Sequence, residues 1–365
     1  MIRGDIAERS KTGDSPRTLH HRLVMGWTAV VLLLLVPAKF FYRTGDHAAA
    51  FRVGLGLAIP GLSLLLLGRE ELMIYAVFGS VTGMYGRSVR RGRRLRDQLL
   101  AGGLMLLAGC AGILAAPWEL RGWSLVAAGI LCATIASVTA DRFHLRPAGP
   151  FFPLFGFGAL AALPVEGHVA LDGMAVFTAS VLTSLVLGQL ARFAPARSGT
   201  HATPATQEWM MTWRRSGSYT LVILLAGSAG ILCGFENLHW VLAGSVVPLV
   251  AGNARGRLRR GAHRVAGTLI GLAALLAIFS LQLPPPLLGL VVIGLMFPTE
   301  AYMTRNYGLA LSFFTPLIML MIVLADPGTS AHELWERGTG NLLGVAAGIL
   351  GAWLGDMLAG QLRVD

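Results

Sequence analysis

Two short clusters of arginines lie between apolar segments and offer the first candidate chemistry. Arg90 and Arg94 are four residues apart, and Arg255 and Arg259 repeat that spacing. If helix continues through each cluster, its two arginines share one face. Because guanidinium groups stay charged, the clusters predict a cationic vestibule that attracts anionic substrates. Topology determinants that also anchor lipid phosphates are the open alternative.

Acidic residues offer the second candidate chemistry. Glu71 and Glu236 begin the second apolar segment of each half, and Glu300 lies near the end of a later segment. Carboxylates in or near the membrane commonly take up and release protons in pumps. These three residues are therefore proton-coupling candidates, and interfacial acids on the outer side are the alternative for Glu71 and Glu236.

The densest group of polar residues in the second half begins at Glu300. Proline frees backbone groups inside a span, so a neighbouring threonine there is placed to face a cavity. An interfacial Glu300–Arg305 pair at a tight helical hairpin is the alternative. The members are Glu300, Arg305, Asn306, Tyr307, Thr315 and Pro316.

No catalytic constellation accompanies these residues. The sequence lacks Gly-x-Ser-x-Gly, a phosphate-binding glycine loop with lysine, and a metal-spaced His/Cys/carboxylate cluster. We therefore expect no enzyme activity, no cofactor and no metal.

The composition of the chain indicates whether the segments that carry these residues lie in water or in lipid. Hydrophobic residues make up 54% of the chain and charged residues only 13%, whereas soluble domains carry about a quarter charged residues. A chain this apolar belongs in a lipid bilayer. The net charge of +11 comes from arginines clustered between apolar runs, as the positive-inside rule predicts, which argues against a nucleic-acid partner.

An internal repeat organises the chain. Residues 79–104 align without a gap to residues 244–269, with eight of 26 positions identical, and Glu71 matches Glu236 at the same offset. We therefore expect an all-α integral membrane protein with two parallel six-helix repeats, about twelve spans in all.

The expected domains follow from this repeat. Residues 1–50 form a polar tail and a short apolar run at 23–36, which is either an extra span or an interfacial helix. Residues 51–193 form the first repeat and residues 217–361 the second. Residues 194–216, which contain prolines, glycine and arginines, form a linker. Both arginine loops are expected on the cytoplasmic side of the inner membrane.

Four motifs resemble those of the fusaric-acid-resistance (FUSC) family, which is related to aromatic acid exporters. The likeness covers roughly residues 50–360. The motifs are Phe78-Gly79-Ser80 through Met84-Tyr85-Gly86-Arg87, Arg264-Val265-Ala266-Gly267-Thr268-Leu269-Ile270-Gly271, Arg305-Asn306-Tyr307 leading to Thr315-Pro316, and Arg337-Gly338-Thr339-Gly340-Asn341-Leu342-Leu343-Gly344.

This resemblance implies efflux of small aromatic or weak carboxylic acids across the inner membrane, driven by the proton gradient. It adds Thr268 to the substrate-pathway candidates. The family is also similar to plant anion channels, in which six-span units pair and arginines line the pore. An uncoupled anion channel is therefore the runner-up, and a membrane enzyme or scaffold is the third class. The expected partners are an organic anion and the lipid bilayer, with a homo-oligomer left open.

Overall fold

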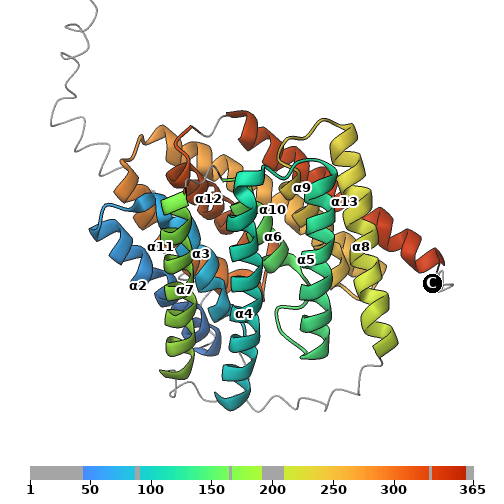
Figure 1. The fold of residues 1–365 in the computed structure, drawn as a ribbon, viewed down its shortest axis with the longest axis horizontal. Helices are drawn as coiled ribbons and strands as arrows, with labels where there is room; N and C mark the ends of the chain where they lie inside the picture. Colours follow the sequence, from blue (N-terminus) through green and yellow to red (C-terminus); the bar gives the residue numbers. More distant parts are fainter. Residues whose placement is uncertain (1–43, 87–90, 164–166, 191–208, 329–330, 359–365) are drawn as a thin grey trace, which may run out of the picture.

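The computed structural model describes residues 44–86, 91–163, 167–190, 209–328 and 331–358, and all regular structure in these ranges is helical (Figure 1). Helices satisfy every backbone N–H and C=O internally, as lipid requires. The apolar run at 23–36 lies outside the described residues. The helices are α2 (Thr44–Leu66), α3 (Met73–Ser80), α4 (Arg91–Ala115), α5 (Trp123–Arg142), α6 (Phe151–Ala161), α7 (Gly167–Leu190), α8 (Trp209–Leu232), α9 (Leu238–Ser245), α10 (Ala254–Ser280), α11 (Pro285–Met303), α12 (Tyr307–Ala325) and α13 (Ala331–Leu358).

Nine of the described helices are long and apolar enough to cross a membrane, rather than the twelve expected. The shorter ones are α3, α6 and α9, with 8, 11 and 8 residues, whereas a span needs about 20. Every residue of α3 and α9 is buried by neighbouring helices. Their apolar composition therefore reflects the protein interior rather than contact with lipid.

Two helix starts bear on the linker and on the second arginine cluster. Helix α8 begins at Trp209, inside the stretch 194–216 that was expected as a linker. Helix α10 begins at Ala254, so the second arginine cluster is helical. Its start is set by Asn253, whose side-chain oxygen accepts a hydrogen bond of 2.7 Å from the Gly256 N–H. This cap satisfies a backbone donor that a helix start leaves without an intrahelical partner.

The two short helices α3 and α9 contact α7 and α13 at matched positions. Gly79 of α3 lies against Phe177 and Ser180 of α7, and Gly244 of α9 lies against Asn341 and Gly344 of α13. Small residues at these positions let helix backbones approach closely in lipid. The two glycines therefore allow close contact between α3 and α7 and between α9 and α13.

The two halves interleave. Two helices of the first half, α2 and α3, pack on α11 and α12 of the second half. In the same way, α8 and α9 of the second half pack on α5 and α6 of the first half. Where they meet, the ring of Phe155 lies 5.5 Å from Phe78, 5.4 Å from Trp240 and 6.4 Å from Phe314, measured between centroids. One aromatic cluster thus joins helices from both halves.

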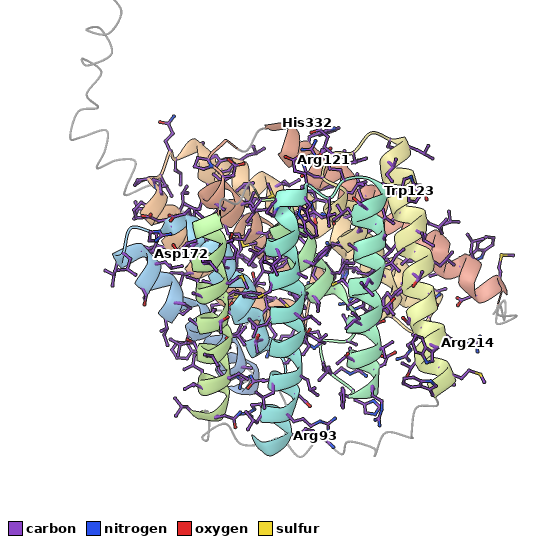
Figure 2. The ribbon with its side chains drawn as sticks, viewed as in Figure 1. Arg93, Arg121, Trp123, Asp172, Arg214 and His332 are labelled. Atoms are coloured by element: carbon purple, nitrogen blue, oxygen red, sulfur yellow. The ribbon has the colours of Figure 1, made fainter. Side chains whose placement is uncertain are left out.

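Six tryptophans are exposed near the ends of the long helices. Tryptophan prefers the headgroup level of a bilayer, so these residues mark two interfaces. They are Trp118, Trp123 and Trp335, and Trp209, Trp213 and Trp353. Figure 2 shows charged groups at both ends of the helices, with Arg93 and Arg214 toward one end and Arg121, Asp172 and His332 toward the other.

Replacing Gly344 with alanine is expected to destabilise the protein by about 1–3 kcal/mol, because the added carbon would collide with the Val241 carbonyl oxygen on α9. Gly355→Ala on the same helix is the matched control, since nothing lies within 4 Å of its added carbon. Thermal unfolding in detergent measures both variants. Equal melting temperatures would contradict the close α9–α13 contact.

Candidate functional site

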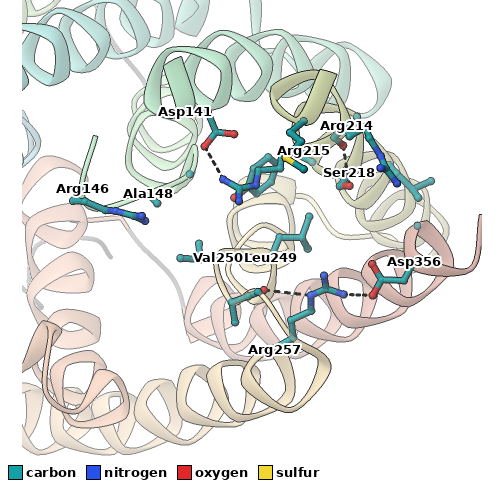
Figure 3. Close-up of a pocket in the computed structure, with 18 residues that line it drawn as sticks. Asp141, Arg146, Ala148, Arg214, Arg215, Ser218, Leu249, Val250, Arg257 and Asp356 are labelled. Carbon is teal, nitrogen blue, oxygen red and sulfur yellow. Dashed lines mark hydrogen bonds and ion pairs between the residues drawn. The ribbon is translucent and has the colours of Figure 1, made fainter. Parts of the chain in front are cut away.

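A cavity of about 740 Å³ opens at the end of the molecule where α8 and α10 begin (Figure 3). The loop between α5 and α6 contributes from the first half. The starts of α8 and α10 and the end of α13 contribute from the second half. Its charged lining residues are Asp141, Arg146, Arg214, Arg215, Arg257 and Asp356. The cavity therefore lies between the two halves and is rich in arginine.

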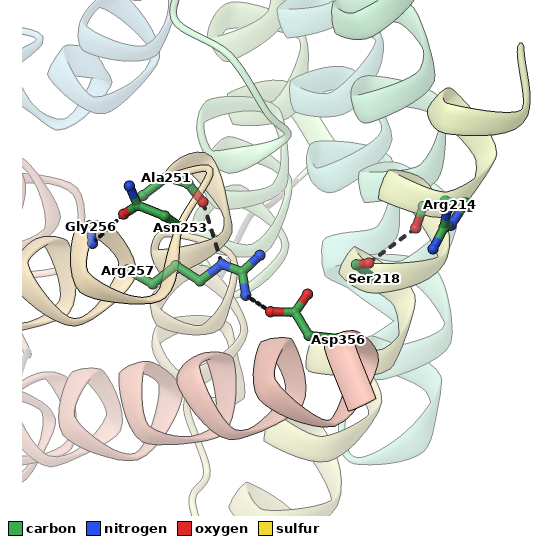
Figure 4. A network of polar contacts seen from close by, with 7 residues as sticks. All are labelled: Arg214, Ser218, Ala251, Asn253, Gly256, Arg257 and Asp356. Carbon is green, nitrogen blue, oxygen red and sulfur yellow. Dashed lines mark hydrogen bonds and ion pairs between the residues drawn. The ribbon is translucent and has the colours of Figure 1, made fainter. Parts of the chain in front are cut away.

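Two ion pairs use both acids of this cavity. An Nη1–H of Arg215 lies 3.3 Å from Asp141 Oδ1, and an Nη1–H of Arg257 lies 2.6 Å from Asp356 Oδ2. The Nε–H of Arg257 also donates to the Ala251 carbonyl at 3.4 Å (Figure 4). Arg146 and Arg214 have no ion-pair partner among the described residues, so the lining keeps an excess of positive charge.

The four arginines singled out by the sequence lie apart. Arg90 is outside the described residues. Arg94 is buried, and its guanidinium donates to the carbonyls of Gly86 at 3.2 Å and Gly188 at 3.1 Å. Arg255 and Arg259 are exposed and line one surface hollow on α10, so they share a face as expected.

The structure gives different surroundings to two arginines that the sequence alignment pairs. The alignment pairs Arg94 with Arg259, but these residues differ in burial. It is Arg257 whose Nε–H reaches a carbonyl just before its own helix, as that of Arg94 does.

Burial separates the three candidate acids. Glu71 is half-exposed and pairs with Arg69, and Arg69 also pairs with Asp172 at 2.8 Å. The hydrogen bonds to Glu71 and Asp172 raise the pKa of Arg69. Glu236 is exposed. Glu300 near the end of α11 is 1% exposed and is the buried member of the three.

The structure reveals a buried acid that sequence reasoning missed. Glu336 of α13 accepts hydrogen bonds from the backbone N–H groups of Glu236 at 2.8 Å and Asn237 at 3.1 Å, and from Asn237 Nδ2 at 2.6 Å. These groups precede α9, so the carboxylate satisfies donors at the start of that helix. No local pattern predicts this contact, because the partners are about 100 residues apart.

The polar residues around the turn between α11 and α12 have different surroundings and contacts. Asn306 caps α12 by accepting from the Leu309 N–H at 3.1 Å, and neighbouring Arg305 is exposed. Tyr307 is partly buried, and its hydroxyl accepts from Arg264 at 3.2 Å. The sequence thus groups residues with different roles, and only Tyr307 of these three reaches into the interior.

The two threonines are enclosed. Thr268 and Thr315 are both fully buried, on α10 and α12. The hydroxyl of Thr315 has no hydrogen-bond partner among the described residues, and Gly271 of α10 lies directly against its Cβ. Thr315 therefore lies where α10 and α12 meet, outside the arginine-rich cavity.

Two buried arginines are the second feature that sequence reasoning missed as a site. Arg264 of α10 and Arg337 of α13 are 4% and 3% exposed. The two belong to separate motifs of the sequence, yet the fold brings them together, because Arg264 donates to Asn341, one turn beyond Arg337 on α13. The signal that could have found them is a charged residue inside a long apolar helix.

These features define an all-helical, multi-pass membrane protein with a basic cavity between its halves. A family model described as fusaric acid resistance protein-like matches residues 221–355, so this part of the chain is similar to that family. The match includes three of the four motifs and leaves out Phe78 to Arg87. The family is one of membrane transport and resistance. No curated protein and no solved structure matches the chain.

Proposed function

We propose that this protein exports small organic anions, in particular aromatic or other weak carboxylic acids, across the inner membrane. The single observation that carries the proposal is the cavity between the halves with its excess of arginines. Fixed positive charge in a recess raises the local concentration of anions. The likeness of residues 221–355 to a family of fusaric acid resistance proteins supports the same function.

The proposed architecture is two parallel six-helix units, in which α3, α6 and α9 are short interior helices. Matched contacts support it, because α2–α11 corresponds to α8–α5, and α3–α7 corresponds to α9–α13. In this arrangement the expected linker, residues 194–216, connects the units, and α8 begins within it. By the positive-inside rule the arginine-rich end faces the cytoplasm, so the cavity receives its anion there.

Proton coupling is the finer part of the proposal, and Glu300 is its first candidate. It is the buried acid among Glu71, Glu236 and Glu300. An acid enclosed by protein is exposed to solvent only when the helices move, which links its protonation to the transport cycle. The exposed acids equilibrate with bulk water in every state and are weaker candidates.

Flux of radiolabelled benzoate in proteoliposomes tests the function. Faster flux with an imposed pH gradient supports a coupled exporter. Current that follows voltage and ignores the pH gradient replaces the exporter with the runner-up, an uncoupled anion channel. Absence of flux for a panel of aromatic and aliphatic acids rejects transport and leaves an enzyme or a scaffold.

Neutralising the unpaired cavity arginines in Arg146→Gln/Arg214→Gln is expected to slow benzoate uptake about tenfold at low ionic strength, because the attraction of the cavity for anions is reduced. The loss should shrink in high salt, where the screening length falls to about 3 Å at 1 M. Arg121→Gln at the opposite end is the matched control. A salt-independent loss, or equal loss in the control, would contradict a vestibule at the cavity.

A further inference from the structure

Arg337 is buried without a hydrogen-bond partner. It lies in the second turn of α13, 3% exposed, and its guanidinium carbon is 4.2 Å above the centroid of the Trp240 ring. None of the described residues accepts a hydrogen bond from it, and its Nε is enclosed. A guanidinium carries five N–H donors and stays charged. All five donors are therefore left for a group that the described residues do not supply.

Burial in this form is costly. Removing an ion from water without a hydrogen-bonded counter-ion costs several kcal/mol even after relaxation. A desolvated cation–π contact returns only about 2 kcal/mol. An arginine kept inside a membrane protein at such a cost usually marks a pathway or ligand site. Arg337 is therefore retained for a reason other than stability.

A second cation lies close to it. The Nε–H of Arg264 donates to Asn341 Oδ1 at 2.9 Å, and its guanidinium lies 4.8 Å from the Phe151 ring centroid. Its charge repels that of Arg337. Within the part of the chain that the structure describes, neither guanidinium has a carboxylate at ion-pair distance. Two buried positive charges thus share one region with no anion.

Neighbouring groups suit a carboxylate with a flat body. Asn341 is one turn beyond Arg337 on α13, and its buried Nδ2 has no acceptor within the described part of the chain. The nearest acid in sequence, Glu336, is engaged at the start of α9. Beyond Trp240 lies the ring of Phe155, with a centroid separation of 5.4 Å. The region therefore combines unused donors with aromatic surface.

Among the described residues, the first half holds no counterpart of this contact. The repeat matches Trp240 with Tyr75, and Gly173 of α7 lies against the Tyr75 ring, where an added carbon would lie 2.6 Å from Cζ. The contact of Arg337 with Trp240 is the one arginine–tryptophan contact in the described ranges.

We propose that Arg337 binds the carboxylate of an organic acid in the protein interior, with Asn341 Nδ2 as a further donor and Arg264 as a second positive charge. The planar guanidinium matches a carboxylate in bidentate geometry, and the aromatic body of the acid lies against the Trp240–Phe155 cluster. This inference rests on the proposed export function and deepens it by naming an internal substrate site distinct from the arginine-rich cavity.

Calorimetric titration of the purified full chain in detergent with benzoate tests the site. Arg337→Met is expected to weaken binding at least tenfold, because the bidentate donor is lost. The same variant should melt at a higher temperature than the unaltered protein without ligand, because an unpaired buried charge is replaced by an apolar side chain of similar length. A purely structural arginine would instead give a lower melting temperature.

Two further variants keep the test sharp. Arg337→Lys retains the charge but not the planar pair of donors, so it should bind benzoate with intermediate affinity. Arg259→Gln, on the exposed face of α10, should leave binding unchanged. Benzyl alcohol, which lacks the carboxylate, should not bind. Equal affinity for chloride and benzoate would overturn the assignment to an organic acid.

The experiments can reject the internal substrate site and the export function independently of each other. Benzoate binding that is lost in Arg337→Met, in a protein that gives no flux, leaves the site standing and rejects export. Flux that persists unchanged in a folded Arg337→Met variant rejects the site and leaves export standing. Unchanged benzoate affinity in that variant also overturns the site.

Discussion

Glu336→Ala is expected to destabilise the protein by about 3 kcal/mol or more, since hydrogen bonds to a buried charged group are worth about 1.5–3 kcal/mol each. The substitution removes the acceptor for the Glu236 and Asn237 N–H groups at the start of α9. It also leaves the Asn237 side chain without that acceptor. Thermal unfolding in detergent, together with the yield of monodisperse protein, measures the effect.

Glu236→Ala is the matched control for this prediction. Glu236 is exposed and takes part only through its backbone N–H, which alanine retains, so its melting temperature should hardly move. Glu336→Gln should fall between the two, because it keeps one acceptor oxygen but loses the charge that favours a helix N-terminus. If Glu236→Ala were the more damaging substitution, the assignment of the cap to Glu336 would be wrong.

Glu300→Gln is expected to abolish proton coupling. A gradient of one pH unit stores about 1.4 kcal/mol per proton, enough for about a tenfold gradient of a substrate exchanged for one proton. Glutamine keeps the size of this buried side chain but cannot titrate. Benzoate should then equilibrate without accumulating in proteoliposomes that hold a pH gradient.

The controls for this second prediction are Glu71→Gln and Glu236→Gln, which should keep the accumulation of the unaltered protein. Glu71 pairs with Arg69 and Glu236 is exposed, so neither needs helix motion to meet water. Benzoate binding in detergent checks that Glu300→Gln still folds. Full accumulation in Glu300→Gln, with loss in either control, would move the proton site to that control.

Helix contacts were the most predictable part of the fold. A four-residue spacing of glycines favours close approach of helices in lipid. Gly267 and Gly271 of α10 have this spacing and lie against Gly308 and Thr315 of α12. Such spacing is readable because one turn of helix brings these residues to the same face. The prediction needs no knowledge of the partner helix.

The number of spans was not predictable in the same way. Apolar composition marks a segment as shielded from water without saying whether lipid or protein shields it. Helices α3 and α9 are shielded by protein. Hydropathy alone therefore counted them as spans, and the count of twelve exceeded the nine helices of sufficient length in the described ranges.

The candidate site shows the same division. Location in the membrane, helical structure and an excess of arginines follow from the sequence alone. They can be read there because composition and periodicity depend only on residues that are close together in the chain. Only the tertiary structure decided that Glu336 rather than Glu236 is buried, and that Arg264 and Arg337 enter one interior region from separate helices. Burial and pairing of charges depend on segments far apart in sequence, and packing of the whole chain sets both.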